Sequence, residues 1–453
     1  MFRNNKYLVV GLGITGASVV EYLLKNGAAV IVTDSRTEPP QLAELKHKHP
    51  NLEVLLGAIT VPEQITHIVL SPGVAINTPQ IQAAIARGVQ VFGDIELFAQ
   101  VVDKPVLAVT GSNGKSTVTT LLGAMATASG LNPGLGGNLG TPALQLLDSQ
   151  FDCYILELSS FQLETLHSLC PKVVTILNIS PDHMDRYDDL TAYQQAKQRI
   201  FLNAGHAVIN RQDALTVVPA SFRIPSISFG LDIPTGSNYG LIIHENIAWL
   251  AKGATPLMPL QRMAMLGAHN VANALAALAM GEIAGFSLLA MLATLLSFTG
   301  LEHRCEQVIN SQGVVWVNDS KGTNVAATVA AIDGLAASIP GKWIIILGGI
   351  GKNADFAPLV MPVAKNCKAA ILIGAEAPAL WDLLHDVLPC YKAQDMSEVV
   401  KIANQHVAAG DGVLLSPACA SFDMFNNYMH RGEVFKQQVL QRIGKHNATA
   451  TID

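Results

Sequence analysis

Residues 111–117 read GSNGKST and gather glycines, a lysine and hydroxyl side chains in one short segment. The commonest phosphate-binding loop has the pattern G-x-x-x-x-G-K-[ST], whereas here no glycine stands five positions before Gly114. Lys115 can nevertheless reach terminal phosphates as a point charge, and the hydroxyl of Ser116 or Thr117 can coordinate Mg²⁺. A strand-like run precedes the segment and a helix-like run follows it. The segment therefore predicts a shortened phosphate loop that binds a nucleotide; the alternative is a surface turn with a chance lysine.

Ligand-type side chains lie at the ends of two later strand-like runs, 153–160 and 173–180. They are Glu157, Asn178, Asp182, His183 and Asp185. Open α/β sheets bind ligands outside the carboxyl ends of their strands. A glutamate and a histidine there would suit a metal ion that bridges phosphate oxygens. Any one of these side chains alone also fits a helix cap, and Asp182 could begin the next helix.

The segment GLGITG places Gly11, Gly13 and Gly16 directly after a strand-like run and at the start of a helix-like one. Glycines permit a tight turn and a close approach to a diphosphate, whose charge the helix N-terminus attracts. Asp34 ends the next strand-like run, where a ribose-binding carboxylate would lie. A nucleotide diphosphate fits this pattern, and so does a tight turn without a ligand. Taken alone, the loop would also suit an NAD-dependent dehydrogenase, which would leave residues 111–117 unexplained.

A third group of polar residues follows strand-like runs in the last third of the chain. It comprises Arg304, Asp319, Lys321, Thr323, Lys352 and Ser421. Arg304 offers a planar fork of donors that suits phosphate. Each residue alone is as consistent with a solvated turn, but together they predict a second polar surface. That surface could face the phosphate loop across a domain cleft.

These residues must be positioned by alternating strands and helices, because short β-branched runs alternate with helical patterns throughout the chain. Strand series begin near residues 7, 104 and 313, the stretch from 226 to 251 looks antiparallel, and an apolar helical region covers 270–298. We therefore predict an α/β protein of three domains. They are a Rossmann-like domain (1–95), a central P-loop-type mononucleotide-binding ATPase domain (96–300) and a second Rossmann-like domain (301–453).

Composition excludes several classes of protein. The 453 residues are 50% hydrophobic and 14% charged, which is typical of a well-buried globular protein. A net charge of −6 without a dense basic block argues against a nucleic-acid partner. The apolar stretch 286–298 is too short to span a bilayer and predicts a buried helix. The N-terminus shows no cleavable apolar segment, and six scattered cysteines predict reduced, mostly buried thiols in a cytoplasm, with neither zinc nor disulfides.

Beyond single motifs, a series of segments along essentially the whole chain resembles the Mur ligases of bacterial peptidoglycan synthesis. They are GSNGKST, ELSSFQLE, NISPDHMDRY, AHNVANALAA, HRCE, NDSKGTN and LLSPACASFDMFNNYMHRG. The resemblance is to a member that adds D-glutamate to UDP-N-acetylmuramoyl-L-alanine with ATP. It implies that the first domain binds the UDP of the substrate, not a nicotinamide. We accordingly expect a cytoplasmic monomer without membrane insertion or a nucleic-acid partner.

The resemblance also implies a mechanism through an acyl phosphate, with Lys115 and two Mg²⁺ neutralising charge where anions meet. By this resemblance Ser116 and Glu157 hold one magnesium ion, and His183 helps to hold the other. Lys197 matches a lysine that the family carries as a carbamate, which would serve as a further magnesium ligand. By its sequence alone, Lys197 is one of several lysines on a polar helix face. Asp182 joins Lys115, His183 and Lys197 among the implied catalytic residues.

Substrate contacts are implied in the same way. Those for ATP are Gly111, Ser112, Asn113, Gly114, Lys115, Ser116, Thr117, Asn270, Asn273, His303, Arg304 and Asp319. Those for the UDP-substrate are Ile14, Thr15, Asp34, Ser35, Arg36, Ser71, Asn138 and Ser159. Those for the incoming amino acid are Lys321, Thr323, Lys352, Ser421, Phe422 and Tyr428. The chain departs from the family at Ile350, where aspartate is expected, and at Tyr428, where phenylalanine is expected.

Other functions compete with this one. Another amino-acid ligase of the family would fit much of the chain, but a diamino-acid ligase is expected to carry a D-N-P-R-type motif, which the sequence lacks. A folylpolyglutamate synthase would not be expected to open with a UDP-type domain. A catalytically silent nucleotide-binding module would have no need of Lys115, Glu157, His183 and Lys197.

Overall fold

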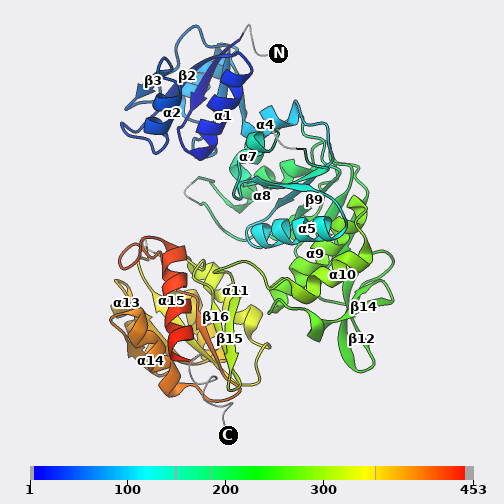
Figure 1. Ribbon diagram of the computed structural model, residues 1–453, viewed down its shortest axis with the longest axis vertical. Helices are drawn as coiled ribbons and strands as arrows, with labels where there is room; N and C mark the ends of the chain where they lie inside the picture. Colours follow the sequence, from blue (N-terminus) through cyan, green and yellow to red (C-terminus); the bar gives the residue numbers. More distant parts are fainter. Residues whose placement is uncertain (1–4, 148–149, 185, 352–353, 444–453) are drawn as a thin grey trace. The chain divides into compact units, whose positions relative to one another are not determined.

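The computed structural model of the chain describes residues 5–147, 150–184, 186–351 and 354–443. These residues form three sheets with helices packed against them, which confirms the predicted α/β class (Figure 1). The chain divides into two compact units, Met1–Leu260 with Asn273–Thr294 and Gln261–Ala272 with Leu295–Asp453. Two of the sheets belong to the first unit, and the third belongs to the second.

The first sheet has five parallel strands in the order β3-β2-β1-β4-β5. Its elements are β1 (Lys6–Val10), α1 (Ile14–Lys25), β2 (Ala29–Asp34), α2 (Leu42–Lys48), β3 (Glu53–Leu56), β4 (His67–Leu70), α3 (Pro79–Ala86), β5 (Gln90–Gly93) and α4 (Asp94–Ala99). Leu8 and Val10 pack in one apolar cluster and Tyr7 and Val9 in another, because side chains alternate along a strand. The strand order reverses between β1 and β4, so their carboxyl ends form a switch point where ligands bind in doubly wound folds.

The second sheet has nine strands in the order β14-β13-β12-β11-β10-β9-β6-β8-β7. They are β6 (Val106–Thr110), β7 (Pro133–Gly137), β8 (Cys153–Glu157), β9 (Val173–Ile176), β10 (Ala207–Asn210), β11 (Ser226–Phe229), β12 (Tyr239–His244), β13 (Ile247–Lys252) and β14 (Thr255–Pro259). The antiparallel patch expected from residue 226 begins later, because β11 pairs in parallel with both of its neighbours. The first antiparallel pair is β12–β13, joined at Glu245 and Asn246, whose positive φ angles of 51° and 61° suit a tight hairpin turn.

The helices of this region are α5 (Lys115–Ala128), α6 (Ala143–Leu146), α7 (Ser160–Glu164), α8 (Leu190–Gln198), α9 (Ala268–Ala284) and α10 (Leu288–Ser297). The apolar region 270–298 is therefore two helices, separated at Gly285, whose φ angle is +93°. The prediction that 286–298 is a buried helix is wrong in part, since Met291 and Leu295 are buried but Leu289 is 81% exposed. An apolar run too uniform to show a period conceals which face meets solvent.

The third sheet has six strands in the order β15-β16-β20-β17-β18-β19. Its elements are β15 (Glu306–Ser311), β16 (Val314–Asn318), α11 (Val325–Leu335), β17 (Trp343–Gly348), α12 (Val360–Asn366), β18 (Cys367–Ile373), α13 (Ala377–Leu384), β19 (Cys390–Lys392), α14 (Met396–His406), β20 (Gly412–Leu415) and α15 (Tyr428–Arg442). Ile344 and Ile346 pack with α14 and α15, which lie side by side, while Ile345 and Leu347 pack with α11, α12 and α13 (Figure 1). Helices therefore cover both faces of this sheet.

The six cysteines are free thiols, four of them buried, as the sequence predicts. Across the ranges that the structure describes, no helix combines the length and the apolar character needed to cross a bilayer.

Candidate active site

The phosphate loop joins β6 to α5, which begins at Lys115. Gly111 and Gly114 have φ angles of +151° and +83°, conformations that other residues rarely adopt. A Cβ on Gly114 would also lie 2.6 Å from Oδ1 of Asn273, so the loop packs closely against α9. Ser116 and Thr117 are buried in the first turn of α5, where helical N–H groups have no intrahelical acceptor. This loop can therefore bind a phosphate.

Hydrogen bonds to residues that follow β9 hold the phosphate loop in place. Asn178 accepts a hydrogen bond from the Asn113 N–H (2.8 Å) through its side chain and from the Ser112 N–H (2.9 Å) through its backbone carbonyl. The Ser112 hydroxyl donates to the carbonyl of Ser180 (2.9 Å). The loop is thus fixed by its neighbour in the sheet before any ligand binds, which is what electrostatic preorganisation requires.

Lys115 folds back over the phosphate loop. Its ammonium nitrogen Nζ donates to the carbonyl oxygens of Gly111 (2.8 Å) and Ser112 (3.0 Å). The charge is therefore held beside the position that a phosphate chain would occupy along the loop. A lysine placed in this way stabilises negative charge as it develops on a transferred phosphoryl group.

Lys197 is buried, not on a polar helix face as its sequence context indicates. It is only 1% exposed on α8, and its Nζ donates to the carbonyl of Gly111 (2.9 Å). The ring of Tyr193, one helical turn earlier, lies 4.5 Å from Nζ. Burial and the nearby charge of Lys115 lower the pKa of Lys197 to about 6, against the opposing effects of Asp182 and Glu157. A largely neutral amine at neutral pH is a nucleophile, and an ordinary lysine is not.

Glu157 ends β8 and is almost fully buried. Its Oε1 accepts from Nδ2 of Asn138 (2.7 Å), and its backbone carbonyl accepts from the N–H of Asn138 (2.8 Å). Among the described residues, Oε2 of Glu157 has no hydrogen-bond partner. A buried carboxylate oxygen without a partner is costly, so this atom fits a cation.

The described residues contain no group of three or more His, Cys, Asp or Glu side chains that could hold a metal by themselves. A magnesium ion at Glu157 would therefore draw other ligands from a hydroxyl such as that of Ser116 and from phosphate oxygens. Such a set is what Mg²⁺ accepts, because it is usually bound by one or two carboxylates together with substrate phosphates and water. The residues present fit that ion.

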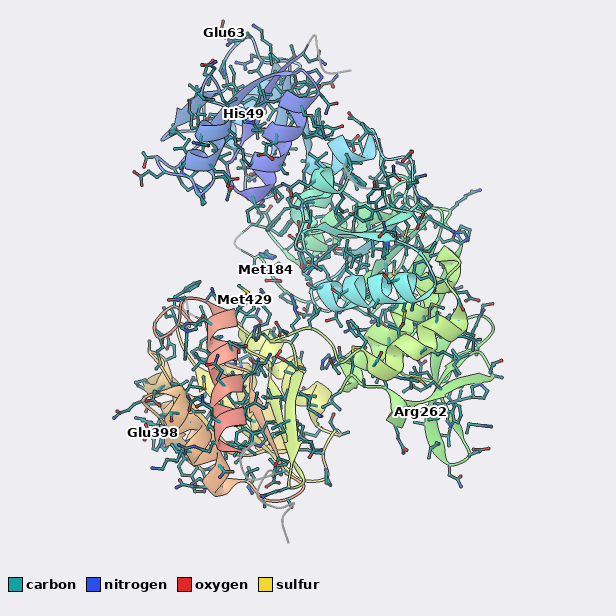
Figure 2. All side chains as sticks on the ribbon, viewed as in Figure 1. His49, Glu63, Met184, Arg262, Glu398 and Met429 are labelled. Atoms are coloured by element: carbon teal, nitrogen blue, oxygen red, sulfur yellow. The ribbon has the colours of Figure 1, made fainter. Side chains whose placement is uncertain are left out.

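Asp182 and His183 lie in the segment that follows β9, and both are partly exposed. His183 has a φ angle of 57°, its backbone N–H donates to Oδ1 of Asp182 (3.0 Å), and its ring lies edge-on to Phe161 at 4.9 Å. The next side chain, Met184, is exposed (Figure 2). Asp182 is not the first residue of α8, because Asp189 caps that helix by accepting from the N–H of Ala192. Asp185 lies outside the described residues.

Glu164, the last residue of α7, binds the segment that follows β9. It accepts hydrogen bonds from the guanidinium of Arg186 (2.9 Å) and the hydroxyl of Tyr187 (2.6 Å). Ser159, at the start of the same helix, forms a capping box with Gln162. Arg186 and Tyr187, which follow the candidate residues His183 and Asp182 along the chain, are therefore held against α7.

Asp34, at the end of β2, contacts the loop that follows β1. Oδ2 of Asp34 accepts from the N–H of Leu12 (2.7 Å), and the carboxylate receives two bonds from the Arg36 guanidinium (2.9 and 2.7 Å). The bonds from Arg36 lower the pKa of Asp34 to about 2. Ser71, after β4, donates to the carbonyl of Gly11 (2.7 Å), so both strands at the switch point contribute.

Three more residues assigned to the UDP-substrate lie around this loop, whereas Asn138 and Ser159 lie beside Glu157 and at the start of α7. Ile14 and Thr15 begin α1, and Ile14 and Ser35 are exposed. Gly16 must lack a side chain, because a Cβ there would lie 2.0 Å from the carbonyl oxygen of Gly11. This close packing of helix on turn is the role expected of the third glycine in such a loop.

In the second unit, Asp319 is buried directly after β16. It accepts from the hydroxyl of Ser416 (2.7 Å) and the N–H of Cys305 (3.1 Å), and burial raises its pKa to about 6. His303 is also buried, with Nδ1 2.9 Å from Nδ2 of Asn318. Arg304 lies between His303 and Cys305 and acts electrostatically on Asp319.

Most residues assigned to the amino acid lie at the same edge of the third sheet. The Nζ of Lys321 lies 4.1 Å from the ring centroid of Tyr428, a cation–π contact. Ser421 is buried in the loop after β20, whereas the neighbouring Phe422 is 66% exposed. Thr323 donates its backbone N–H to the carbonyl of Lys321 (2.8 Å). Lys352 lies outside the described residues.

Two other assigned residues share α9 but belong to different units. Asn273 is buried against the phosphate loop, as described above, and belongs to the first unit. Asn270, also buried, donates to the carbonyl of Leu266 (2.8 Å) and belongs to the second unit.

Sequence reasoning missed Tyr193, Ser180 and the Glu164 assembly. Tyr193 could have been found, because it stands four residues before Lys197 and so on the same helix face. Its hydroxyl lies 3.3 Å from that of Ser112, which connects α8 to the phosphate loop. Ser180 and Glu164 have no local pattern that would distinguish them from a turn serine and a surface glutamate.

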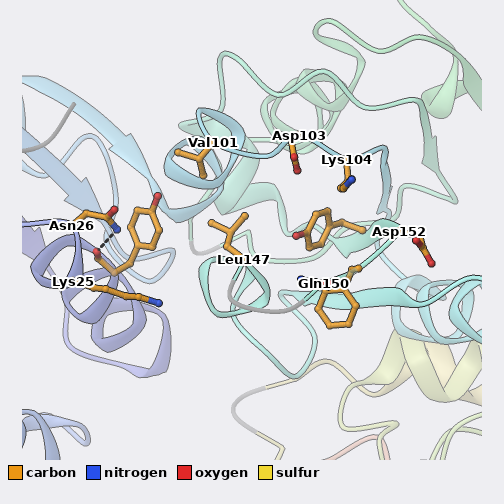
Figure 3. Close-up of a pocket in the computed structure, with 11 residues that line it drawn as sticks. Lys25, Asn26, Val101, Asp103, Lys104, Leu147, Gln150 and Asp152 are labelled. Carbon is orange, nitrogen blue, oxygen red and sulfur yellow. Dashed lines mark hydrogen bonds between the residues drawn. The ribbon is translucent and has the colours of Figure 1, made fainter.

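A crevice of about 710 Å³ in the first unit lies away from these residues (Figure 3). It is lined at one side by Lys25 and Asn26 and at the other by Asp103, Lys104 and Asp152, which precede β6 and β8. It therefore lies at the amino ends of these strands, opposite the edge that carries the phosphate loop.

Three family models match the chain in order. They are "Mur ligase MurD-like, N-terminal domain" at residues 5–93, "Mur ligase middle domain" at 109–281 and "Mur ligase, glutamate ligase domain" at 303–419.

Curated relatives match over nearly the full length. The UDP-N-acetylmuramoylalanine--D-glutamate ligase of Legionella pneumophila (strain Paris) is 46% identical over 443 residues, 96% of this chain and 99% of the relative. The protein of the same name from Pseudomonas savastanoi pv. phaseolicola is 49% identical over 434 residues, 95% and 97% of the two chains.

Solved structures share the fold at low identity. The UDP-N-acetylmuramate-alanine ligase of Thermotoga maritima has a TM-score of 0.60 at 20% identity, over 96% of this chain and 99% of that one. The MurF ligase of the same organism, in complex with ADP, has a TM-score of 0.58 at 16% identity, over 98% and 96%. With three family models in order and full-length relatives at nearly half identity, the chain belongs to the Mur ligase family.

Proposed function

We propose that this chain is an ATP-dependent ligase that joins the amine of D-glutamate to the free carboxylate of UDP-N-acetylmuramoyl-L-alanine, with release of ADP and phosphate. The product is a precursor of peptidoglycan. The observation that carries the reaction class is the pairing of a preorganised phosphate loop with Lys115, the neutral Lys197 and the unpartnered Oε2 of Glu157. The choice of D-glutamate is supported by the names of relatives that are 46–49% identical over nearly the whole chain.

The reaction proceeds in two steps. An oxygen of the substrate carboxylate attacks the γ-phosphorus of ATP, the bond to the β-phosphate oxygen breaks, and an acyl phosphate and ADP form. The amine nitrogen of glutamate then attacks the carbonyl carbon, loses a proton and expels phosphate, which leaves an amide. Lys115 stabilises charge on the transferred phosphoryl group, and the loop N–H groups hold the nucleotide phosphates in position.

Two Mg²⁺ ions would supply further charge neutralisation at the meeting point of carboxylate and phosphate. Ser116 and Glu157 are the residues proposed to hold one ion, and His183 and a carbamylated Lys197 contribute to the other. Carbamylation requires an uncharged amine, and the burial of Lys197 supplies one near neutral pH. Asp182, beside His183, lies in electrostatic range of Lys197 and is proposed to help orient that site.

The three substrates are assigned to three domains, 1–95, 96–300 and 301–453, which the order of the family matches supports. The first binds UDP through the Asp34 and Ser71 loops. The second binds ATP, and the third binds glutamate through Lys321, Thr323, Ser421 and their neighbours. We further propose closure of the domains on ATP binding, a monomeric state and a cytoplasmic location.

The test is phosphate release from ATP and Mg²⁺ in the presence of UDP-N-acetylmuramoyl-L-alanine and one amino acid at a time, with both enantiomers of glutamate in the panel. Release that depends on D-glutamate alone is the expected result. Release with another amino acid would keep the ligase chemistry and refute the substrate. Folded protein that releases no phosphate with any of them would refute the proposal.

A further inference from the structure

Lys321 and Thr323 lie in one loop and Ser421 and Phe422 in another, and a third loop leaves the neighbouring strand β17 beside them. The loops are 319–323 after β16, 416–422 after β20 and 348–351, which starts at Gly348, the last residue of β17. Because the three strands are adjacent and parallel, their carboxyl ends bring the loops to one edge of the sheet. Backbone bonds connect them in pairs: the N–H of Ala418 donates to Gly322 (2.9 Å) and that of Gly348 to Pro417 (2.9 Å).

Arg431, in the first turn of α15, donates hydrogen bonds to all three loops. It is 1% exposed, and its guanidinium donates to the hydroxyl and the carbonyl of Ser320 (both 3.0 Å) and to the carbonyl of Cys419 (3.0 Å). A longer bond of 3.4 Å reaches the carbonyl of Gly348. Ser320 in turn donates to the carbonyl of Tyr428 (2.8 Å), so the ring that contacts Lys321 is part of the same network.

The charge of Arg431 is satisfied by oxygen dipoles. Its hydrogen bonds go to three carbonyls and one hydroxyl, while Asp319 and Asp423 act on it through space. Burial lowers the pKa of Arg431 to about 10, which leaves it protonated at neutral pH. Burying an arginine among carbonyl dipoles is expensive for stability alone, since apolar residues of similar volume often serve a core as well or better.

We propose that Arg431 is a positioning residue for the amino-acid substrate: its guanidinium sets the mutual placement of the three loops, and through Ser320 and Tyr428 it orients Lys321. The inference rests on the proposed binding of D-glutamate by these loops. A planar guanidinium can donate in three directions at fixed angles, whereas an ammonium offers a point charge on a flexible chain. Lysine at this position would therefore keep the charge but not the geometry.

The test compares wild type, Arg431→Lys and Arg431→Met by steady-state phosphate release, with D-glutamate and ATP varied separately. Phe435→Leu is the matched control, because Phe435 is buried on the same helix but packs only in the apolar core. We expect Arg431→Lys to raise KM for D-glutamate by ~10-fold or more while KM for ATP changes by less than about threefold. Arg431→Met should raise KM for D-glutamate further. Phe435→Leu should lower Tm without changing KM for D-glutamate or for ATP.

Unchanged KM for D-glutamate in folded Arg431→Lys would overturn the inference. Equal increases in KM for D-glutamate and for ATP would also overturn it. So would a Phe435→Leu variant whose KM for D-glutamate rises as much as that of Arg431→Lys. If Arg431→Met does not fold, Arg431→Lys alone decides the question. A wild type that does not depend on D-glutamate would refute the proposed function instead, so the two failures are distinguishable.

Discussion

Lys115 and Lys197 donate hydrogen bonds to the same acceptor, the carbonyl oxygen of Gly111, at 2.8 and 2.9 Å. Two ammonium groups so close together would repel each other strongly in a buried site. The conflict is resolved by lowering the pKa of Lys197, chiefly through burial and then through the charge of Lys115 itself. Lys197 is therefore the member of the pair that becomes a neutral amine near neutral pH.

Replacing Lys115 by methionine should reduce phosphate release by ~10²–10³-fold or more, because it removes the cation that stabilises the transferred group. The measurement is kcat with all three substrates saturating. Lys104→Met is the matched control, since Lys104 precedes the same strand at its opposite end and should leave kcat unchanged. Near-normal turnover in Lys115→Met would refute the assigned role of the phosphate loop.

Lys197 should form a carbamate at neutral pH. Its pKa is about 6, below the ordinary value of 10.5, so the amine is mostly neutral above pH 6 and becomes protonated and unreactive below it. With ¹³C-labelled bicarbonate, a carbamate resonance should appear at pH 7–8 and weaken as the pH falls below 6. The resonance should be absent from Lys197→Met.

Short carboxylates offer a functional check on the same residue. Lys197→Ala should lose activity and regain part of it with added acetate or formate, which can replace the missing carbamate as a magnesium ligand. A wild-type enzyme without the resonance, or a variant that no carboxylate rescues, would count against the carbamate.

Glu157→Gln should raise the Mg²⁺ concentration needed for half-maximal activity by ~10-fold or more, because the position of Oε2 then carries an NH₂ group, which does not coordinate Mg²⁺. Asn138 can keep its hydrogen bond to the remaining oxygen, so Tm should change little. Titration of activity with Mg²⁺ at saturating ATP measures the effect. An unchanged Mg²⁺ requirement would show that the unpartnered Oε2 does not bind the ion.

The parts of the site that could be predicted from the sequence are those carried by contiguous motifs. The phosphate loop and the turn at Gly11 depend on a strand, glycines and a helix start within a few residues, and those local requirements are visible in the chain. Glu157 and Asp319 could be placed because Glu157 ends β8 and Asp319 directly follows β16, and parallel strands bring such positions to the carboxyl edge of their sheet.

What could not be predicted depends on distant packing. Lys197 stands on a helix with many polar neighbours, and only its contact with Gly111, 86 positions earlier, shows that it is buried. Arg431 lies within a segment that the family resemblance includes, but the sequence does not reveal its partners, which are 111, 83 and 12 residues away. No local period encodes such contacts. The stretch that begins at β11 likewise looks antiparallel in the sequence, whereas β11 pairs in parallel with β12.

Asp34→Asn should destabilise the first sheet domain by about 1–2 kcal/mol at pH 7, after allowance for the half-exposed Arg36 partner. The pKa of Asp34 is about 2 in the folded chain and 3.8 in its ordinary state, so the carboxylate stabilises the fold fully above pH 4. That stabilisation declines as the pH falls from 4 towards 2, because the unfolded chain then binds a proton first. The difference between wild type and variant should shrink over the same range.

Hydrogen exchange at the Leu12 amide, which donates to Asp34, measures this locally. The four tryptophans of the chain all lie beyond residue 248, so their fluorescence would not follow this domain. Glu44→Gln is the control: its carboxylate is exposed in a surface pair with Lys48, and its loss should leave stability nearly unchanged. Faster exchange at Leu12 in Asp34→Asn but not in Glu44→Gln would place the stabilisation in the buried carboxylate. Equal exchange rates in the two variants would mean that the Asp34 network does not stabilise the loop after β1.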